Sequence, residues 1–209
     1  MKQALSALVL SFGLSVPALA SAQELGAKGD MVFSVDRLMG ISGTHIAGEM
    51  GPVEYDDDIT SLSLSWRASP DFSPFDTARL AFDYLVIDHL SVGGSLGYAS
   101  YDYDQQNDGS TFIISPRVGY VYAFGKVVGI WPRGGVTYHS TSVDTLFDEK
   151  GFALSLECPF TFSPAEHFAF HIGPSFDVDM FGSRDPSPIN KGDRTYRSVA
   201  LNGGILGWF

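Results

Sequence analysis

The sequence predicts an all-β protein, an eight-stranded up-and-down antiparallel transmembrane β-barrel. Two observations carry this prediction. Apolar and polar residues alternate with period two, most clearly from Ile114 to Val178, and short connections alternate with long polar ones. Because successive side chains of a strand point to opposite faces, each such strand has one apolar face and one polar face. A membrane barrel turns the apolar face to lipid and keeps the polar face inside.

The first 22 residues have the pattern of a secretory signal peptide. A positively charged start precedes an apolar run over residues 5–16, and small residues before Ala22 offer a cleavage pattern. The apolar run is too short for a membrane anchor helix, and Pro17 interrupts it. We expect cleavage after Ala22, so that residues 23–209, about 187 in number, form one barrel domain.

Composition argues against several other classes of protein. The formal net charge of −11 disfavours nucleic acid as a partner, because nucleic-acid binding needs a basic patch. Cys158 is the only cysteine, so no internal disulfide can form. No cofactor and no metal are expected. Residues 104–109 are faintly similar to the start of a calcium-binding loop, but Ser115 stands where that loop needs Glu.

Nine segments follow the strand pattern. They are residues 31–41, 60–66, 78–87, 91–101, 111–124, 127–139, 151–163 and 168–178, and a last segment that ends at Phe209. Loops are expected over residues 42–58, 68–77, 102–110, 140–150 and 179–195, with short turns at 88–90, 125–126 and 164–167. The three short turns fall on the same side as the C-terminus, as the periplasmic turns of a barrel do.

The strand count leaves the N-terminal part open, since single-chain bacterial barrels have even numbers of strands. In our interpretation, residues 42–77 form one long excursion on the outside, and residues 60–66 are a hairpin arm or an extension of the rim. The alternative is that residues 60–66 cross the membrane and residues 31–41 do not. Either choice leaves eight strands of about 9–11 residues.

Charged side chains at inward positions form the sharpest candidate site. Arg117, Arg133 and Glu157 lie on three successive strands at a similar distance from their periplasmic turns, about 25 Å along the strand. An eight-stranded barrel is just wide enough for side chains to fill, so a charge inside it must be paired. We therefore expect a lumen charge network that plugs the barrel. Its further members are Asp83, His171 and Asp177. A gate or an ion path is the alternative role.

Arg37 conflicts with the simple alternation. Its position relative to Phe33 and Met39 would point it to lipid, which costs about 2–4 kcal/mol at the midplane. A β-bulge near Asp36 would turn the side chain inward.

The aromatic residues near the short turns predict a girdle at one membrane interface. They are Tyr120, Tyr122, Phe124, Phe160, Phe162, Phe168 and Phe170. The core of a soluble β-sandwich is the alternative explanation.

In these features the chain resembles the small outer-membrane β-barrels of Gram-negative bacteria, the OmpA-, OmpX- and OmpW-like proteins. The resemblance covers residues 30–209 and includes the aromatic end Trp208-Phe209. In that family a C-terminal Phe is the usual feature read by the barrel assembly machinery, so Phe209 is the implied assembly signal. Gly203 and Gly207 depart from the bulkier apolar residues that are commoner there.

The resemblance implies a monomer in the cell outer membrane, with lipid, lipopolysaccharide and the assembly machinery as partners. The leading interpretation of function is a structural or surface-interaction barrel with a plugged lumen. The alternative is a narrow OmpW-like channel for small or apolar solutes. A lipid-modifying enzyme is not expected. The barrel-shaped lipid A deacylases use a His-x-Ser pair, and neither His139-Ser-Thr141 nor His171-Ile-Gly173 has that spacing.

Overall fold

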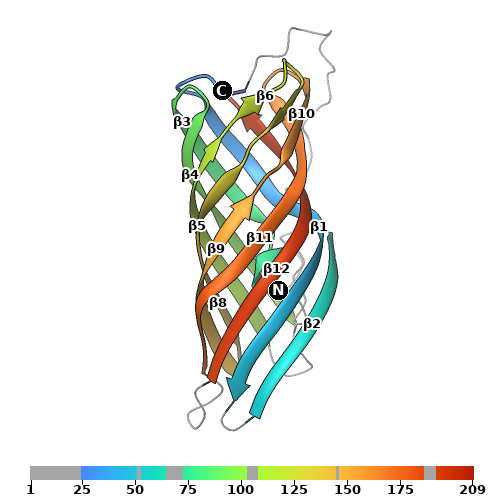
Figure 1. Ribbon diagram of the computed structural model, residues 1–209, viewed down its shortest axis with the longest axis vertical. Coiled ribbons are helices and arrows are strands. Elements are labelled where there is room, and N and C mark those ends of the chain that lie inside the picture. Colours follow the sequence, from blue (N-terminus) through green and yellow to red (C-terminus); the bar gives the residue numbers. More distant parts are fainter. Residues whose placement is uncertain (1–24, 51–52, 65–72, 103–107, 145, 186–191) are drawn as a thin grey trace, which may run out of the picture.

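The residues that the computed structural model describes, 25–50, 53–64, 73–102, 108–144, 146–185 and 192–209, form a closed antiparallel β-barrel (Figure 1). The strands are β1 (Met31–Met50), β2 (Val53–Leu64), β3 (Arg79–Ile87), β4 (Leu90–Asp102), β5 (Asp108–Tyr120), β6 (Tyr122–Ala123), β7 (Val128–Ile130), β8 (Arg133–Val143), β9 (Phe147–Glu157), β10 (Phe160–Ala165), β11 (Phe168–Asp185) and β12 (Gly192–Trp208). A short 3-10 helix, η1 (Pro74–Asp76), precedes β3. None of the described helical residues forms a helix long and apolar enough to cross a membrane. The predicted signal peptide lies outside the described residues.

Eight wall positions close the barrel. In order around the wall they are β1, β3, β4, β5, β8, β9, β11 and β12, and β12 pairs again with β1. At the end with the short turns, β6 follows β5, β7 precedes β8 and β10 follows β9, each across a small break in the same wall position. Two of these breaks contain Pro132 and Pro159, which cannot donate a backbone N–H to the ladder. The predicted eight-stranded antiparallel barrel is confirmed.

The two faces of the wall differ in polarity as predicted. Outward positions carry exposed apolar side chains, among them Leu80, Phe82, Leu96, Ile114, Leu154, Leu156, Val199 and Leu201. Inward positions carry buried polar side chains, among them Ser91, Ser95, Ser115, Thr137, Ser155, Ser175 and Ser198. A β-sandwich would bury the apolar face between two sheets. The exposed apolar belt is instead the surface that a barrel turns to lipid.

Aromatic side chains gather on the outside near the short turns. The rings of Tyr120 and Tyr122 lie 4.6 Å apart between centroids, and those of Phe168 and Phe170 lie 5.0 Å apart. Tyr122 and Phe124 are more than half exposed. This arrangement is typical of an interfacial girdle in a membrane barrel.

The three short turns lie at the same end of the barrel as the C-terminus (Figure 1). His89 and His167 adopt left-handed backbone conformations there, with φ of 70° and 60°. The turn predicted at residues 125–126 is wider than two residues: it spans residues 124–127, and the Phe124 N–H donates to the Val128 carbonyl at 2.7 Å.

The N-terminal strands resolve the strand count. One edge of β1 pairs with β12, while the other pairs with β3 from Met31 to Asp36 and with β2 from Met39 to Met50. β2 therefore follows β3 along the same edge of β1 toward the outside, and Figure 1 shows β2 beside the outer part of β1. The interpretation of a hairpin arm is right and β1 crosses the membrane, but the predicted loop over residues 42–58 is wrong.

Other predicted loops are also too long. The loops predicted over residues 140–150 and 179–195 are largely strand, because β9 begins at Phe147, β11 ends at Asp185 and β12 begins at Gly192. The loop predicted over residues 102–110 is shortened at both ends, because β4 ends at Asp102 and β5 begins at Asp108. Beyond the membrane both faces of a hairpin meet water. The apolar alternation therefore stops, although the backbone ladder continues.

Candidate functional site

The barrel interior is filled at three levels, and the one nearest the short periplasmic turns is an apolar plug. Leu25, Trp131 and Trp208 pack there with Val32, Leu85, Val121, Ala169 and Leu206. Leu25 is held in place by the turn that follows it. The backbone N–H groups of Gly26 and Ala27 donate to Asp30 at 3.1 and 3.0 Å, and His89 donates to the Gly26 carbonyl at 2.8 Å.

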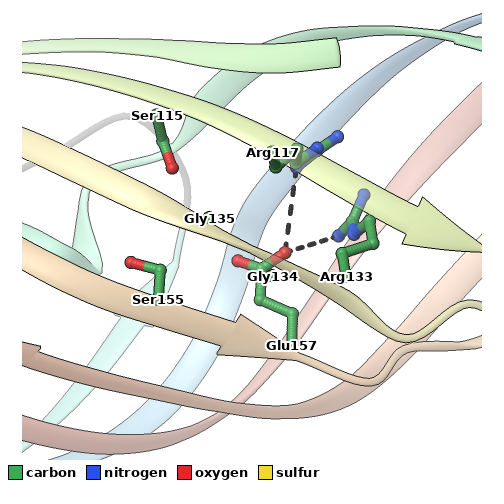
Figure 2. Close-up of a pocket in the computed structure, with 7 residues that line it drawn as sticks. All are labelled: Ser115, Arg117, Arg133, Gly134, Gly135, Ser155 and Glu157. Carbon is green, nitrogen blue, oxygen red and sulfur yellow. Dashed lines mark ion pairs between the residues drawn. The ribbon is translucent and has the colours of Figure 1, made fainter. Parts of the chain in front are cut away.

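A layer of ion pairs lies next to the apolar plug, farther from the periplasmic end. Arg117 pairs with Asp83 and Asp36, and its Nε lies 3.1 Å from Asp83. Arg133 pairs with Glu157 at 2.8 Å, and Arg117 lies 3.8 Å from the same carboxylate. Figure 2 shows both guanidinium groups converging on Glu157 from neighbouring strands. The inward parity of these side chains on β5, β8 and β9 brings them to one depth, as the sequence pattern indicated.

Arg37 enters the same layer through a bulge. The register of β1 against β12 shifts between Val35 and Met39, and Arg37 has a φ of 54°. The side chain therefore points inward and pairs with Asp177 and Glu157, each at 2.8 Å. The bulge expected near Asp36 is confirmed, and it spares Arg37 the cost of facing lipid.

The structure places all six predicted network residues inside the barrel. His171 Nε2 lies 3.1 Å from Asp36, and Asp177 accepts from the Ser155 hydroxyl. The predicted network lacked Asp36 and Arg37, and also the buried Arg79, whose Nη2 lies 3.5 Å from the Phe75 carbonyl. Strict alternation would have found two of them, because Arg79 lies on the face opposite to Leu80 and Asp36 continues the inward row of Val32 and Ser34, whereas the orientation of Arg37 depends on the bulge.

The third level is a plug from the segment between β2 and β3. Phe75 is fully buried inside the barrel, and its ring meets His139 and Tyr196 edge-on at centroid distances of 5.4 and 6.2 Å. Its carbonyl accepts from Arg37 at 2.7 Å. Asp76 accepts from the hydroxyls of Ser42 and Ser61, each under 3 Å away.

The sequence interpretation placed residues 68–77 in an outside loop, and for the described part of that segment this is wrong. Ser73, Phe75 and Asp76 are buried in the interior. Proline and polar residues in this segment are typical of a loop, and no periodic pattern marks a loop that folds back into its own barrel.

Polar pairs surround Phe75 toward the outer end of the barrel. His139 Nε2 lies 3.0 Å from Asp179, and the backbone N–H of Tyr196 donates to the same carboxylate at 3.0 Å. Arg194 pairs with Glu149 at 3.1 Å. His139 is in contact with a carboxylate and two aromatic rings. Among its described contacts there is no Ser hydroxyl that it could activate as a nucleophile.

Small cavities lie at the charge layer. Two small pockets there each have a cavity volume of about 10 Å³, about the space of one water molecule. One is lined by Ser115, Arg117, Arg133, Gly134, Gly135, Ser155 and Glu157 (Figure 2). Within the described residues, no group of three or more His, Cys, Asp or Glu side chains is arranged to hold a metal ion.

Phe209 lies at the end of the closing strand. Its backbone exchanges two hydrogen bonds with Met31, at 3.0 and 3.1 Å, and its ring stacks on His167. The side chain is 69% exposed, so it stays accessible at the periplasmic end.

Comparison with known proteins supports the fold. No family model and no curated protein matches the chain. Among solved structures it resembles neisserial surface protein A, with 13% identity and a TM-score of 0.51 over 88% of this chain and 99% of that chain. It also resembles the outer membrane protein OprG from Pseudomonas aeruginosa, with 14% identity and a TM-score of 0.54 over 90% and 99%.

A third similar structure is the outer membrane protein AlkL in lipid bilayers, with 14% identity and a TM-score of 0.52 over 92% of this chain and 94% of that chain. At such identities the likeness concerns the fold. The closed wall, the lipid-facing apolar belt and these three structures together show that the chain is a small eight-stranded β-barrel of the outer-membrane type.

Proposed function

We propose that this protein is a closed outer-membrane barrel with a structural or surface-interaction role, and that it is neither an open pore nor an enzyme. The blocked interior carries the proposal. An apolar plug around Leu25 and Trp131, an ion-pair layer around Glu157 and the inserted Phe75 fill the barrel at three successive levels. An eight-stranded barrel has no room for a water column beside such side chains.

Conductance in a planar bilayer tests the closed barrel. The reconstituted protein should show no steady ion current at neutral pH. The Phe75→Ala variant is a matched control, because removing one closure leaves the other two in place and the current should still be absent. Stable single-channel steps from the unmodified protein would overturn the proposal, and a change in the mass of lipid A on incubation with the protein would contradict the non-enzymatic role.

The proposed partners follow from the outer surface. The apolar belt contacts outer-membrane lipid, including lipopolysaccharide in the outer leaflet, and a monomer suffices to close the wall. The exposed Phe209 is the feature that the assembly machinery would read. Deleting Phe209 should lower the yield of folded, heat-modifiable protein in the outer-membrane fraction, whereas Phe209→Tyr should preserve most of it. Equal yields from the deletion and the intact chain would contradict this role.

A narrow channel for small or apolar solutes is the second candidate. It is favoured by the apolar surroundings of Phe75, where Ile46, Ala153 and Tyr196 form a cluster in the outer half of the interior. A channel function requires η1 to leave the barrel interior, and it also requires the ion-pair layer on the periplasmic side of η1 to open. The same bilayer recordings decide between the two candidates.

A further inference from the structure

One edge of β2 lacks a partner strand among the described residues. All twelve residues of β2 pair with β1, and β2 pairs with no other described strand. β3 pairs with the same edge of β1 only as far as Asp36, and β4 beyond Gly97 pairs only with β5. Because an edge strand presents a row of unpaired backbone N–H and C=O groups, β2 is a template for a further strand.

The outer half of this edge stands above the lipid belt. The outward apolar side chains end at Ile41 on β1 and at Leu62 on β2, both more than half exposed. Farther out on the same face, the next polar positions with ionisable side chains are His45 and Asp58, which lie directly opposite each other. The edge over residues 53–58 therefore meets water, where a segment of another protein can reach it.

A row of ionisable side chains crosses the sheet toward this edge. Arg197 on β12, His45 on β1 and Asp58 on β2 are direct cross-strand neighbours. His45 Nδ1 lies 3.0 Å from Asp58. Because opposite charges favour direct cross-strand positions, a strand added beside Asp58 is stabilised by a cation at that position.

A second row consists of like charges. Asp193 on β12, Glu49 on β1 and Glu54 on β2 lie directly opposite one another. Like charges in such positions destabilise a sheet, so this row also favours a cation at the next position. Asp56 lies between the two rows on the same face of β2, and it is 73% exposed while Asp58 is 87% exposed.

We propose that the outer half of β2 binds an extended segment of another protein with Lys or Arg at alternate positions, which adds to the sheet as a further strand. The free backbone groups of β2 form the ladder, and the alternate cations face Glu54, Asp56 and Asp58. This is the β-strand addition mode of peptide recognition. The inference rests on the surface-interaction role proposed above and names the chemistry of the partner.

Peptide binding to the full protein in lipid nanodiscs tests the inference. The probe is a fluorescent ten-residue peptide in which Lys alternates with Thr, and binding is followed by anisotropy. We expect saturable binding that weakens as salt is added. The same peptide with N-methylated alternate amides keeps the charges but loses the ladder, and the version with Glu for Lys keeps the ladder but reverses the charges. Both should bind at least about tenfold more weakly.

Charge-neutral variants of the protein locate the site. The triple variant Glu54→Gln, Asp56→Asn, Asp58→Asn keeps the β2 edge and should bind the Lys peptide about tenfold more weakly. A matched control removes three carboxylates from other outer hairpins.

The control substitutions are Asp144→Asn, Asp148→Asn and Asp185→Asn, and this variant should bind within about twofold of the unmodified protein.

Three outcomes would overturn the inference. Equal affinity for the N-methylated peptide would mean that charge alone attracts the peptide. Equal losses in the two triple variants would place binding elsewhere on the acidic rim. If the Lys peptide shows no saturable binding, the β2 edge does not bind such a segment. None of these readouts depends on conductance, so failure of this inference and failure of the closed-barrel proposal are distinguishable.

Discussion

The middle of the barrel and its periplasmic end are both closed, but by opposite means. In the middle, Glu157 holds Arg37 and Arg133 at 2.8 Å each, from strands far apart in the sequence. At the periplasmic end, Leu25 packs against Trp131 and Trp208 in a cluster of apolar side chains. The ion-pair layer therefore consists of members that depend on one another, whereas the apolar plug consists of contacts that weaken one at a time.

This difference predicts unequal sensitivity to substitution. Removing one partner of a buried ion pair leaves an uncompensated charge, while removing part of an apolar side chain leaves a cavity into which its neighbours partly relax. The free energy of unfolding, measured by urea titration in detergent with Trp fluorescence, separates the two kinds of closure.

The largest effect is expected from Glu157→Leu. Among the described ion pairs, the substitution leaves Arg133 with a single one, to Asp36 at 3.4 Å, and it removes one of the two carboxylates that pair with Arg37. The free energy of unfolding should fall by about 3–5 kcal/mol. An unchanged urea midpoint would show that the layer adds no stability and that water screens these charges.

Leu25→Ala should have a smaller effect on the apolar plug. Leu25 is 7% exposed and contributes one side chain to a cluster of eight, so the free energy of unfolding should fall by about 2 kcal/mol, the low end for such substitutions. A loss as large as that of Glu157→Leu would contradict the proposed contrast between the two closures.

The double variant Arg133→Leu, Glu157→Leu sharpens the comparison further. Removing both charges leaves Arg37 paired with Asp177 and Arg117 paired with Asp36 and Asp83. The double variant should therefore recover about 1–2 kcal/mol relative to Glu157→Leu alone. If instead the two losses simply add, the residues are not coupled.

The smallest effect is expected outside the membrane. Asp58→Asn removes a carboxylate that is 87% exposed and that, in the described part of the chain, pairs with His45. Surface pairs contribute little, so the free energy of unfolding should change by less than about 0.5 kcal/mol. A larger loss would mean that the outer part of β2 stabilises the whole barrel.

Particular residues show which side-chain orientations the period-two sequence pattern can predict and which it cannot. Period-two alternation correctly turned Arg117, Arg133 and Glu157 inward, because within the lipid belt every second side chain must be apolar. It failed at Arg37, because one bulge shifts the parity of β1 after Asp36, and the charge at an outward position was the sign of that bulge in the sequence. It also underestimated the strands outside the membrane, because water on both faces removes the signal.

By itself, the sequence determined the barrel, its polarity and the inward direction of most charges, since these follow from strand parity and from the lipid environment. Only the tertiary structure decided which carboxylate pairs with which arginine, that Phe75 folds back to close the interior, and that β2 extends the wall position of β3 with one free edge. These are long-range contacts between distant strands, and they depend on the closure of the wall.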